Sequence, residues 1–515
     1  MSALILTLSS LITKILGFFY RIYISNKIGA ECLGLYQLIL PIYTLVWSIS
    51  CAGFTTAISK LIAQEDAKKN KNNINLIIKQ SLIITSIISF LLSIFIYFQA
   101  KNIANLILKD DRLFFSLKIL SISFIFMSLG SCIRGYFFGL RNALIPAISQ
   151  VIEQIAHILT IFFLINKFKS IKDCCAVAVF GIMLGEIAST IYVYICFKSK
   201  KYYKKNKLEK KQNDFSFLES IKKIFLISLP LGANKIITSL LSTFENILIP
   251  QRLILNNNFN LNSALILYGK LTGMAMPLIQ FPSIFLLSLS VSLVPDVSHS
   301  RAIKNQKRID NTISKTLLYT SLVSMFSACF FITFSHEIGI FIYHQNISNM
   351  LKNLGILCPL LYLNIVLSGI LNGFGRQFFI FKINLISSFI NLLTIYFLIP
   401  KFGINAFFLG LFLNLIITTS LYLKLIKKNI KIKLKINNLL IKPLIASFIT
   451  FFLIKPIAHG VIFPSYNNLI SLIINALIML LLYFILILYF GCISLREIKD
   501  IIDSFFKTTE KNERT

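Results

Sequence analysis

The chain has 515 residues, of which 56% are apolar and only 14% charged, and its mean hydropathy is +0.77. A soluble protein of this length needs more charge to cover its surface, so the composition excludes a cytosolic enzyme. The nine Cys residues show no CxxC or Cys/His spacing, so neither a disulfide-stapled domain nor a zinc site is expected. The composition therefore predicts a membrane protein built from apolar helices.

Long apolar runs separated by short polar breaks predict fourteen membrane-spanning helices, and the length of the runs excludes strands. The first run has no basic region before it and no small-residue cleavage site after it, so we expect a retained span and not a signal peptide. The runs cover residues 2–24, 34–59, 76–99, 113–140, 143–166, 174–197, 224–250, 264–295, 316–335, 353–373, 377–399, 404–423, 441–458 and 467–492.

Basic residues are unevenly distributed between the two sets of loops. With a cytoplasmic N-terminus, the inner loops hold 34 Lys and Arg, the outer loops 11 and the spans 7. The inner loop 134–142 contributes Arg134 and Arg141 to this count. The asymmetry predicts a cell-membrane protein with both termini in the cytoplasm. The net charge of +32 is spread over short loops beside membrane helices, which indicates contact with membrane lipids and no nucleic-acid partner.

An internal repeat relates the two halves of the chain. LTIFFLINKF at 159–168 matches LTIYFLIPKF at 393–402 in eight of ten positions, and the same spacing of 234 residues places Gly139 on Gly373. Chance similarity between apolar segments is the alternative. Because six spans separate the copies, the repeat predicts an all-α membrane protein with two parallel six-helix lobes and a binding site between them. We expect lobes at 1–197 and 224–426, a basic cytoplasmic linker at 198–223, helices 13 and 14 within 427–495, and a cytoplasmic tail at 496–515.

Ionisable side chains inside the predicted spans are costly and usually mark a ligand site or a buried pair. Cations outnumber acids there, which favours an anionic ligand such as a phosphate or diphosphate. Alternatively, a cation near a helix end can reach the lipid headgroups, and an acid can pair with a neighbouring cation. The candidate diphosphate-binding residues are Lys14, Arg21, Lys235 and Lys270. The candidate coupling or cavity groups are Glu153, His157, Glu186 and Glu245. Glu153 and His157 share one helical stripe with Gln150 and Gln154.

The run 264–295 is the candidate gate helix, because prolines remove backbone donors and allow a helix to bend. Kinked helices also occur in static bundles, so this pattern alone leaves both interpretations open. The residues that mark it are Gly269, Gly273, Pro277 and Pro282.

Three segments carry a resemblance to a known family: SSLITKILGFFYRIYISNKIGAECLGLYQLILPIY, CIRGYFFGLRNALIPAISQVIEQ and YGKLTGMAMPLIQFPSIFLLSLSVSLVPDVSHS. They resemble the stage V sporulation protein B-like polysaccharide biosynthesis proteins. That group belongs to the multidrug/oligosaccharidyl-lipid/polysaccharide exporter superfamily, with the lipid II flippases and MATE exporters. The resemblance extends over essentially the whole chain. It implies a V-shaped, MATE-like pair of lobes, two C-terminal helices that form a groove for an isoprenoid tail, and a cationic cavity lined by Lys14 and Arg21.

Together these features predict a flippase and not an enzyme. Its expected cargo is an undecaprenyl-pyrophosphate-linked oligosaccharide or peptidoglycan precursor, for cell wall, spore cortex or polysaccharide synthesis. The alternative is a cation-coupled MATE-type multidrug exporter that uses the acids of the spans. A membrane glycosyltransferase is disfavoured because the outer loops are short and poor in acids. We expect no cofactor, H⁺ or Na⁺ as the coupling ion, a monomer, and a cell-wall or polysaccharide synthase as a partner.

Overall fold

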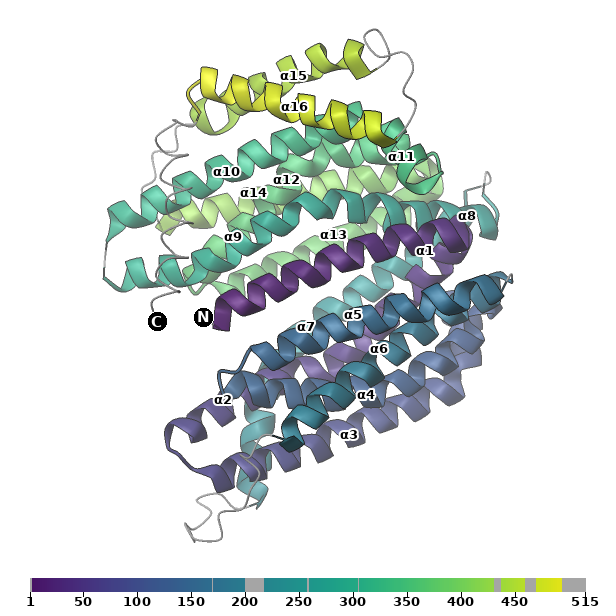
Figure 1. The fold of residues 1–515 in the computed structure, drawn as a ribbon, viewed down its shortest axis with the longest axis vertical. Coiled ribbons are helices and arrows are strands. Elements are labelled where there is room, and N and C mark those ends of the chain that lie inside the picture. Colours follow the sequence, from purple (N-terminus) through teal and green to yellow (C-terminus); the bar gives the residue numbers. More distant parts are fainter. Residues whose placement is uncertain are drawn as a thin grey trace. The chain divides into compact units, whose positions relative to one another are not determined.

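The computed structural model of the protein describes residues 2–168, 170–199, 217–256, 259–303, 305–429, 437–458 and 469–492. Within these ranges the regular structure is helical and no strand is present (Figure 1). Thirteen helices in these ranges are long and apolar enough to cross a membrane. The predicted all-α fold is confirmed, and the chain is a multi-pass membrane protein.

The difference between thirteen helices and fourteen predicted spans lies in the first helical run. This run, Leu11–Ala67, has 57 residues, which corresponds to about 85 Å of helix, nearly three times a bilayer core of about 30 Å. It comprises α1 (Ser2–Trp47) from Leu11 onward, the π-helical segment η1 (Ser48–Ala52) and α2 (Gly53–Ala67). At Gly29 the backbone leaves the helical region, with φ 75° and ψ 172°. Glycine adopts this conformation without a steric penalty, so the run bends there and contains both of the first two predicted spans.

The chain forms two compact units. Unit 1 comprises Met1–Pro277 and Asn384–Gly410, and unit 2 comprises Leu278–Ile383 and Leu411–Thr515. The boundaries fall inside three helices, α9 (Met276–Ala302), α13 (Gln377–Phe402) and α14 (Ile404–Asn429). The lobes expected at 1–197 and 224–426 stay a prediction. Most of the expected linker and the whole expected tail lie outside the described residues.

Unit 1 is built around α4, which packs against α2, α3 and α6, while α5 packs against α6 (Figure 1). Apolar side chains such as Phe54, Ile77 and Phe137 are buried in its core. The elements that complete this unit are α3 (Lys71–Asn102), η2 (Ile103–Leu108), η3 (Asp111–Leu113), α4 (Phe114–Gly139), α5 (Leu144–Leu164), η4 (Ile165–Lys167), α6 (Ile171–Ser199), α7 (Phe217–Ile254), α8 (Leu261–Gly269) and η6 (Lys270–Ala275).

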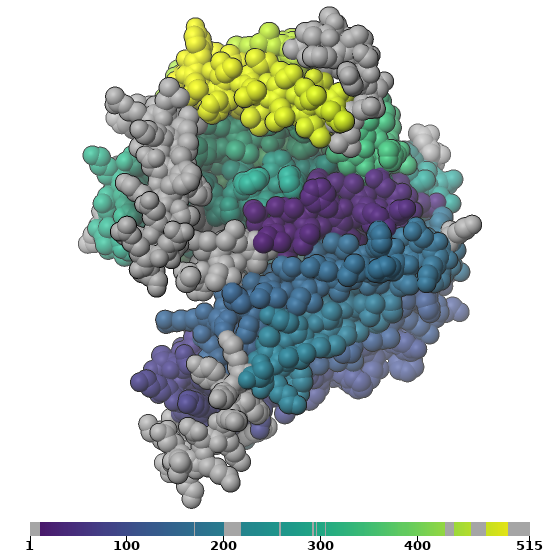
Figure 2. Space-filling view, viewed as in Figure 1, coloured from purple at the N-terminus to yellow at the C-terminus, as the bar shows by residue number. Residues whose placement is uncertain are grey.

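Unit 2 packs α10 against α12 and α15, and α15 against α16. The Tyr483 hydroxyl donates a hydrogen bond of 3.0 Å to the Leu322 carbonyl and so ties α16 to α10. The surface of α16, yellow in Figure 2, carries exposed apolar side chains such as Ile470 and Leu481, as expected for a helix facing lipid. The bounds are α10 (Gln306–Thr333), α11 (Ser335–Tyr343), α12 (Ser348–Gly373), η7 (Asn437–Ile441), α15 (Lys442–Ala458) and α16 (Leu469–Tyr489).

Glycines related by the repeat make the same contact in each unit. A Cβ on Gly139 at the end of α4 would lie 2.7 Å from Ile62 Cβ on α2, and one on Gly373 at the end of α12 would lie 2.9 Å from Val297 Cβ on α9. Both glycines therefore allow a close helix approach that a larger residue would prevent. The same relation holds one turn earlier for Gly135 with Thr55 and Gly369 with Ser290. These matched contacts support the internal repeat found in the sequence.

Candidate functional site

All four candidate diphosphate-binding cations lie in unit 1. Lys14 and Arg21 are on α1 before its bend, Lys235 is on α7, and Lys270 is the first residue of the π-helical segment η6. Helix α1 packs against both α7 and η6. Close contacts are made by the part of α1 after its bend, where Leu33 lies against Gly273 of η6 and the Pro41 carbonyl accepts from Thr243 of α7. That Lys14 and Arg21, before the bend, share one site with Lys235 and Lys270 stays a prediction.

Among the described residues, no carboxylate neutralises any of the four cations. Lys14 and Lys235 are exposed, and Arg21 and Lys270 are half-buried. None of them forms an ion pair with a carboxylate in the described ranges, whereas Lys68, Arg112 and Arg134 do. Cations without a protein partner keep their full capacity to bind an anionic headgroup.

Two of the predicted acids instead meet an arginine in a cluster formed by Tyr43, Arg134, Glu153 and Glu186, here called the charged cluster. Arg134 Nη1 lies 3.6 Å from Glu153 Oε2, and the Tyr43 hydroxyl donates a hydrogen bond to Glu186 Oε1. Glu186 is only 2% exposed, and the side chains of Arg134 and Glu153 are 11% and 35% exposed. Helices α1, α4, α5 and α6 each contribute one member, so the cluster joins four helices of unit 1.

The assignment of Arg134 to a cytoplasmic loop is wrong. Helix α4 continues to Gly139, so Arg134 lies within the helix, more than a turn before its end. Its Nη2 donates to Ser131 Oγ at 3.2 Å, and its Nη1 faces Glu153. The signal for this position was present, since the apolar run continues on both sides of it as Ile133 and 136–138. The predicted orientation of the termini, which used this residue in its loop count, stays a prediction.

The rest of the predicted polar stripe on α5 connects helices. His157 Nε2 lies 2.9 Å from the Tyr20 hydroxyl on α1 and 3.3 Å from the Ala178 carbonyl on α6. A Cβ on Gly17 of α1 would lie 3.9 Å from Gln154 Nε2. These contacts fix α1 onto α5 and α6, which gives His157 a structural role in addition to any part in transport.

Glu245, the third predicted acid, lies on α7 and faces Ser388 and Asn391 of α13. Its Oε1 is buried and has no hydrogen-bond partner among the described residues. The structure therefore brings Glu153 and Glu186 together with Arg134 and gives Glu245 a different set of neighbours.

Two of the four candidate gate residues contact α1. A Cβ on Gly269 would lie 2.7 Å from Gly34 N, and one on Gly273 would lie 2.6 Å from Leu33 Cγ. Pro277 and Pro282 both lie on α9. The first is the last residue of the segment Met1–Pro277 of unit 1, and the second belongs to unit 2. Between α8 and α9 the helix is π-helical over Lys270–Ala275, a local widening that is frequent at functional sites. The role of this helix as a moving gate stays a prediction.

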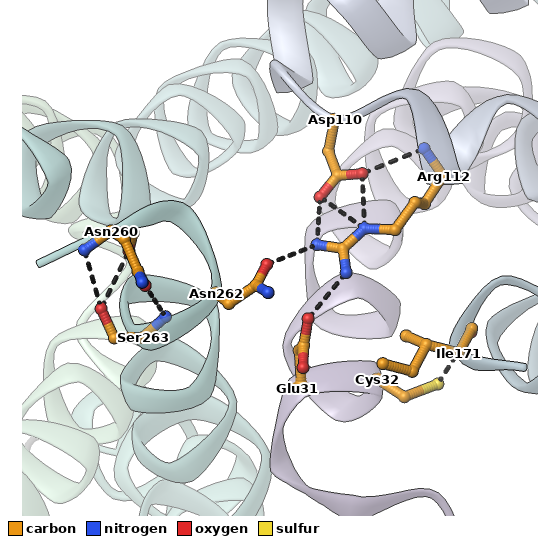
Figure 3. A network of polar contacts seen from close by, with 8 residues as sticks. All are labelled: Glu31, Cys32, Asp110, Arg112, Ile171, Asn260, Asn262 and Ser263. Atoms are coloured by element: carbon orange, nitrogen blue, oxygen red, sulfur yellow. Dashed lines mark hydrogen bonds and ion pairs between the residues drawn. The ribbon is translucent and has the colours of Figure 1, made fainter.

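A second polar network, missed by the sequence analysis, surrounds Arg112 (Figure 3). Its Nη1 lies 2.7 Å from Glu31 Oε1 on α1, and its Nε and Nη2 bind the Asp110 carboxylate at 2.9 and 2.7 Å. Nη2 also lies 3.5 Å from Asn262 Oδ1 on α8. The only signal in the sequence was a short charged break between two spans, which gives no indication of its partners. Arg112 thus links the segment before α4 to α1 just after its bend and to α8.

We expect Arg112→Ala to lower the free energy of unfolding by about 2 kcal/mol, because it leaves buried Asp110 and half-buried Glu31 without their charged donor. Titration of the purified chain with sodium dodecyl sulfate measures this change. Lys101→Ala, at an exposed position of α3, is the matched control and is expected to leave stability unchanged. Equal stability of the two variants would show that the network contributes nothing.

Comparison with known families gives two matches. The sequence model of the family described as "Polysaccharide biosynthesis protein" matches residues 1–301, and the model described as "MatE" matches residues 270–397. The first match covers more than half of the chain. It agrees with the resemblance found in the three sequence segments.

Individual relatives agree with these families. The chain is 31% identical over 344 residues to stage V sporulation protein B of Bacillus subtilis (strain 168), a match over 65% of each protein. It is 28% identical over 210 residues to the lipid II flippase MurJ of the same organism, over 38% of this chain and 39% of that protein. The chain thus spans less than two thirds of the length of these relatives. The solved structure "Lipid II flippase MurJ, inward closed conformation" has a TM-score of 0.68 at 18% identity, over 95% of this chain and 98% of that one, a likeness of fold.

Proposed function

Because the chain belongs to the polysaccharide biosynthesis protein family, we propose that it is a flippase for a lipid-linked saccharide. Its cargo is an undecaprenyl-pyrophosphate-linked oligosaccharide or peptidoglycan precursor, used for cell wall, spore cortex or polysaccharide synthesis. The headgroup crosses the membrane between helices while the isoprenoid tail stays in lipid, and no covalent bond is made or broken. Two relatives of the chain, a lipid II flippase and a stage V sporulation protein, support this cargo class.

The observation that carries the proposal is the set of unneutralised cations on α1, α7 and η6. A diphosphate needs several positively charged donors, and each charge-assisted hydrogen bond contributes about 1.5–3 kcal/mol. Lys14, Arg21, Lys235 and Lys270 have no carboxylate partner among the described residues. The acids of the charged cluster are held by Arg134 and Tyr43, so they do not compete for these cations.

A cation-coupled multidrug exporter is the second candidate, and the MatE match over residues 270–397 favours it. Such a transporter needs acids that are available to a cationic drug. Here Glu153 already faces Arg134, and Glu186 accepts from Tyr43. Expression in a pump-deficient host is therefore expected to give no drug resistance, and resistance would favour the exporter.

Replacing Lys14 and Arg21 by alanine tests the diphosphate site. We expect each replacement to slow headgroup translocation by about 10- to 100-fold, the equivalent of one lost charge-assisted hydrogen bond. The assay uses the full chain in liposomes with a fluorescent undecaprenyl-pyrophosphate disaccharide and measures the fraction accessible from outside over time.

Lys118→Ala is the matched control, because Lys118 is also a cation within a spanning helix but lies over the rings of Tyr97 and Phe114, at 4.8 and 4.6 Å. It is expected to leave the translocation rate unchanged. Undiminished translocation in the Lys14→Ala/Arg21→Ala variant would remove the diphosphate role from these residues. No translocation by the wild-type chain would reject the flippase itself.

A further inference from the structure

The charged cluster contains one more acid than it has cations. Its ionisable side chains are two carboxyls, Glu153 and Glu186, one guanidinium, Arg134, and the Tyr43 phenol. Arginine stays charged in proteins. If both carboxyls were ionised, the cluster would carry a net negative charge between four apolar helices, which is strongly unfavourable.

The excess negative charge is most unfavourable at Glu186. It is 2% exposed, its Oε1 accepts from Tyr43, and its Oε2 is buried with no hydrogen-bond partner among the described residues. An ionised carboxylate with an unsatisfied oxygen is among the most costly groups that a protein interior can hold. A proton on that oxygen removes the charge, which is the largest part of this cost.

The ionisable groups that face Glu186 come from every helix around it. Tyr43 on α1, Arg134 on α4, Glu153 on α5 and Cys51 on η1 act on it directly. The short elements η3 and η4 also touch α6, and their ionisable side chains are Asp111, Arg112 and Lys167. Arg112 is bound to other carboxylates, and His157 is bound to Tyr20 and Ala178, so neither supplies the missing positive charge.

We propose that the charged cluster is a proton-binding site, in which Glu153 and Glu186 share one exchangeable proton and the remaining carboxylate balances Arg134. A metal cation fits less well, because hard cations require about six oxygen ligands and the guanidinium repels them. The Glu153 side chain is 35% exposed and Glu186 only 2%, so Glu153 is the member through which the proton enters and leaves the shared site. Proton binding stands independently of the cargo, whereas its coupling to transport rests on the proposed flippase function.

Infrared difference spectroscopy of the full-length chain counts the proton, because a protonated carboxyl absorbs apart from a carboxylate. In the wild type at neutral pH we expect one protonated carboxyl from the cluster, whose band shifts in D₂O. Glu186→Gln and Glu153→Gln are each expected to lose that band, because one carboxylate then balances Arg134. Arg134→Gln is expected to gain a second protonated carboxyl.

Glu65→Gln is the control. Glu65 is a buried acid that binds Lys68 and Asn73 in place of an arginine, and its removal is expected to leave the cluster band unchanged. If Glu186→Gln kept the band of the protonated carboxyl, the proposal would be overturned. A band that persists in Glu153→Gln would overturn the shared site, since Glu186 would then hold its proton alone. These outcomes do not depend on whether Arg134→Gln folds.

Coupling is tested separately in the liposome assay with an imposed pH gradient. Wild-type translocation of the fluorescent diphosphate lipid is expected to respond to the gradient, and Glu186→Gln is expected to lose that response while Glu65→Gln keeps it. A wild type that flips the lipid without any response would overturn the coupling and leave the flippase function intact. A wild type that flips nothing would reject the flippase, whereas the infrared band would still decide the proton site.

Discussion

Replacing Gly34 by alanine is expected to lower the free energy of unfolding by about 3 kcal/mol, because α1 and α8 cross at this residue with their backbones in contact. A Cβ on Gly34 would overlap the Leu265 carbonyl oxygen and lie 3.0 Å from its carbon. Gly269 meets Gly34 from the other side of the crossing. Because the neighbouring atoms belong to the backbone, no rotamer change relieves the overlap, and the two helices must separate. Detergent titration of the purified chain measures the effect.

Gly17→Ala is the matched control for this substitution. Gly17 lies on the same helix, but the nearest atom to its Cβ would be Gln154 Nε2 at 3.9 Å, an ordinary contact. Alanine there is expected to keep stability or raise it by up to about 1 kcal/mol, through its higher helix propensity. Gly34→Ala combined with Gly269→Ala is expected to cost less than the sum of the two, because one separation relieves both overlaps. Equal free energies of unfolding of Gly17→Ala and Gly34→Ala would show that the crossing contributes nothing to stability.

Loss of the contact between α1 and α8 is also expected to affect transport. Lys270 follows Gly269 directly at the start of η6, so the crossing positions one of the cations proposed to bind the diphosphate. Separation of α1 from α8 is therefore expected to slow translocation as well as to lower stability. A variant that loses stability and keeps full translocation would place Lys270 outside the binding site.

The sequence predicted those features that follow from local hydropathy. Each apolar run from 76–99 onward corresponds to one membrane-spanning helix, because about twenty apolar residues have no other stable arrangement in a bilayer. The repeat also follows from sequence, since Gly139 and Gly373 keep their spacing and their packing partners. The bend at Gly29 could not be predicted in this way, because glycine is compatible with a helix as well as with the positive φ of 75° that bends α1.

Features that depend on which helices meet were not predictable from one sequence. The contact between Gly34 and Gly269 joins distant parts of the chain, and nothing local distinguishes these glycines from others in the spans. Arg134 lies inside the predicted run 113–140, but the loop count also assigned it to the inner loop 134–142, because the two ranges overlap. Its partner Glu153 was recognised as an unusual acid in a span, but the pairing required α4 and α5 to lie together around α6.

Arg134→Met is expected to lower the free energy of unfolding by about 3 kcal/mol, because it leaves two acids in a helical bundle without their cation. This value lies at the low end for a broken buried pair, since the Glu153 side chain is 35% exposed and so is not fully buried. Methionine keeps the apolar length of the side chain, so the loss reports charge more than volume. Detergent titration of the purified chain measures the effect, and Arg134→Lys, which keeps the charge, is expected to retain most of the stability.

A double-mutant cycle separates the ion pair from the packing of α4. Adding Glu153→Gln to Arg134→Met removes the uncompensated acid next to the arginine position, and we expect it to restore about 1–3 kcal/mol. The remaining acid, Glu186, still accepts from Tyr43 and is neutral once it holds a proton. Glu65→Gln in the same Arg134→Met background is expected to restore nothing, because Glu65 pairs with Lys68 and Asn73. If the two additions had the same effect, the distance of 3.6 Å between Arg134 and Glu153 would reflect proximity without energetic coupling.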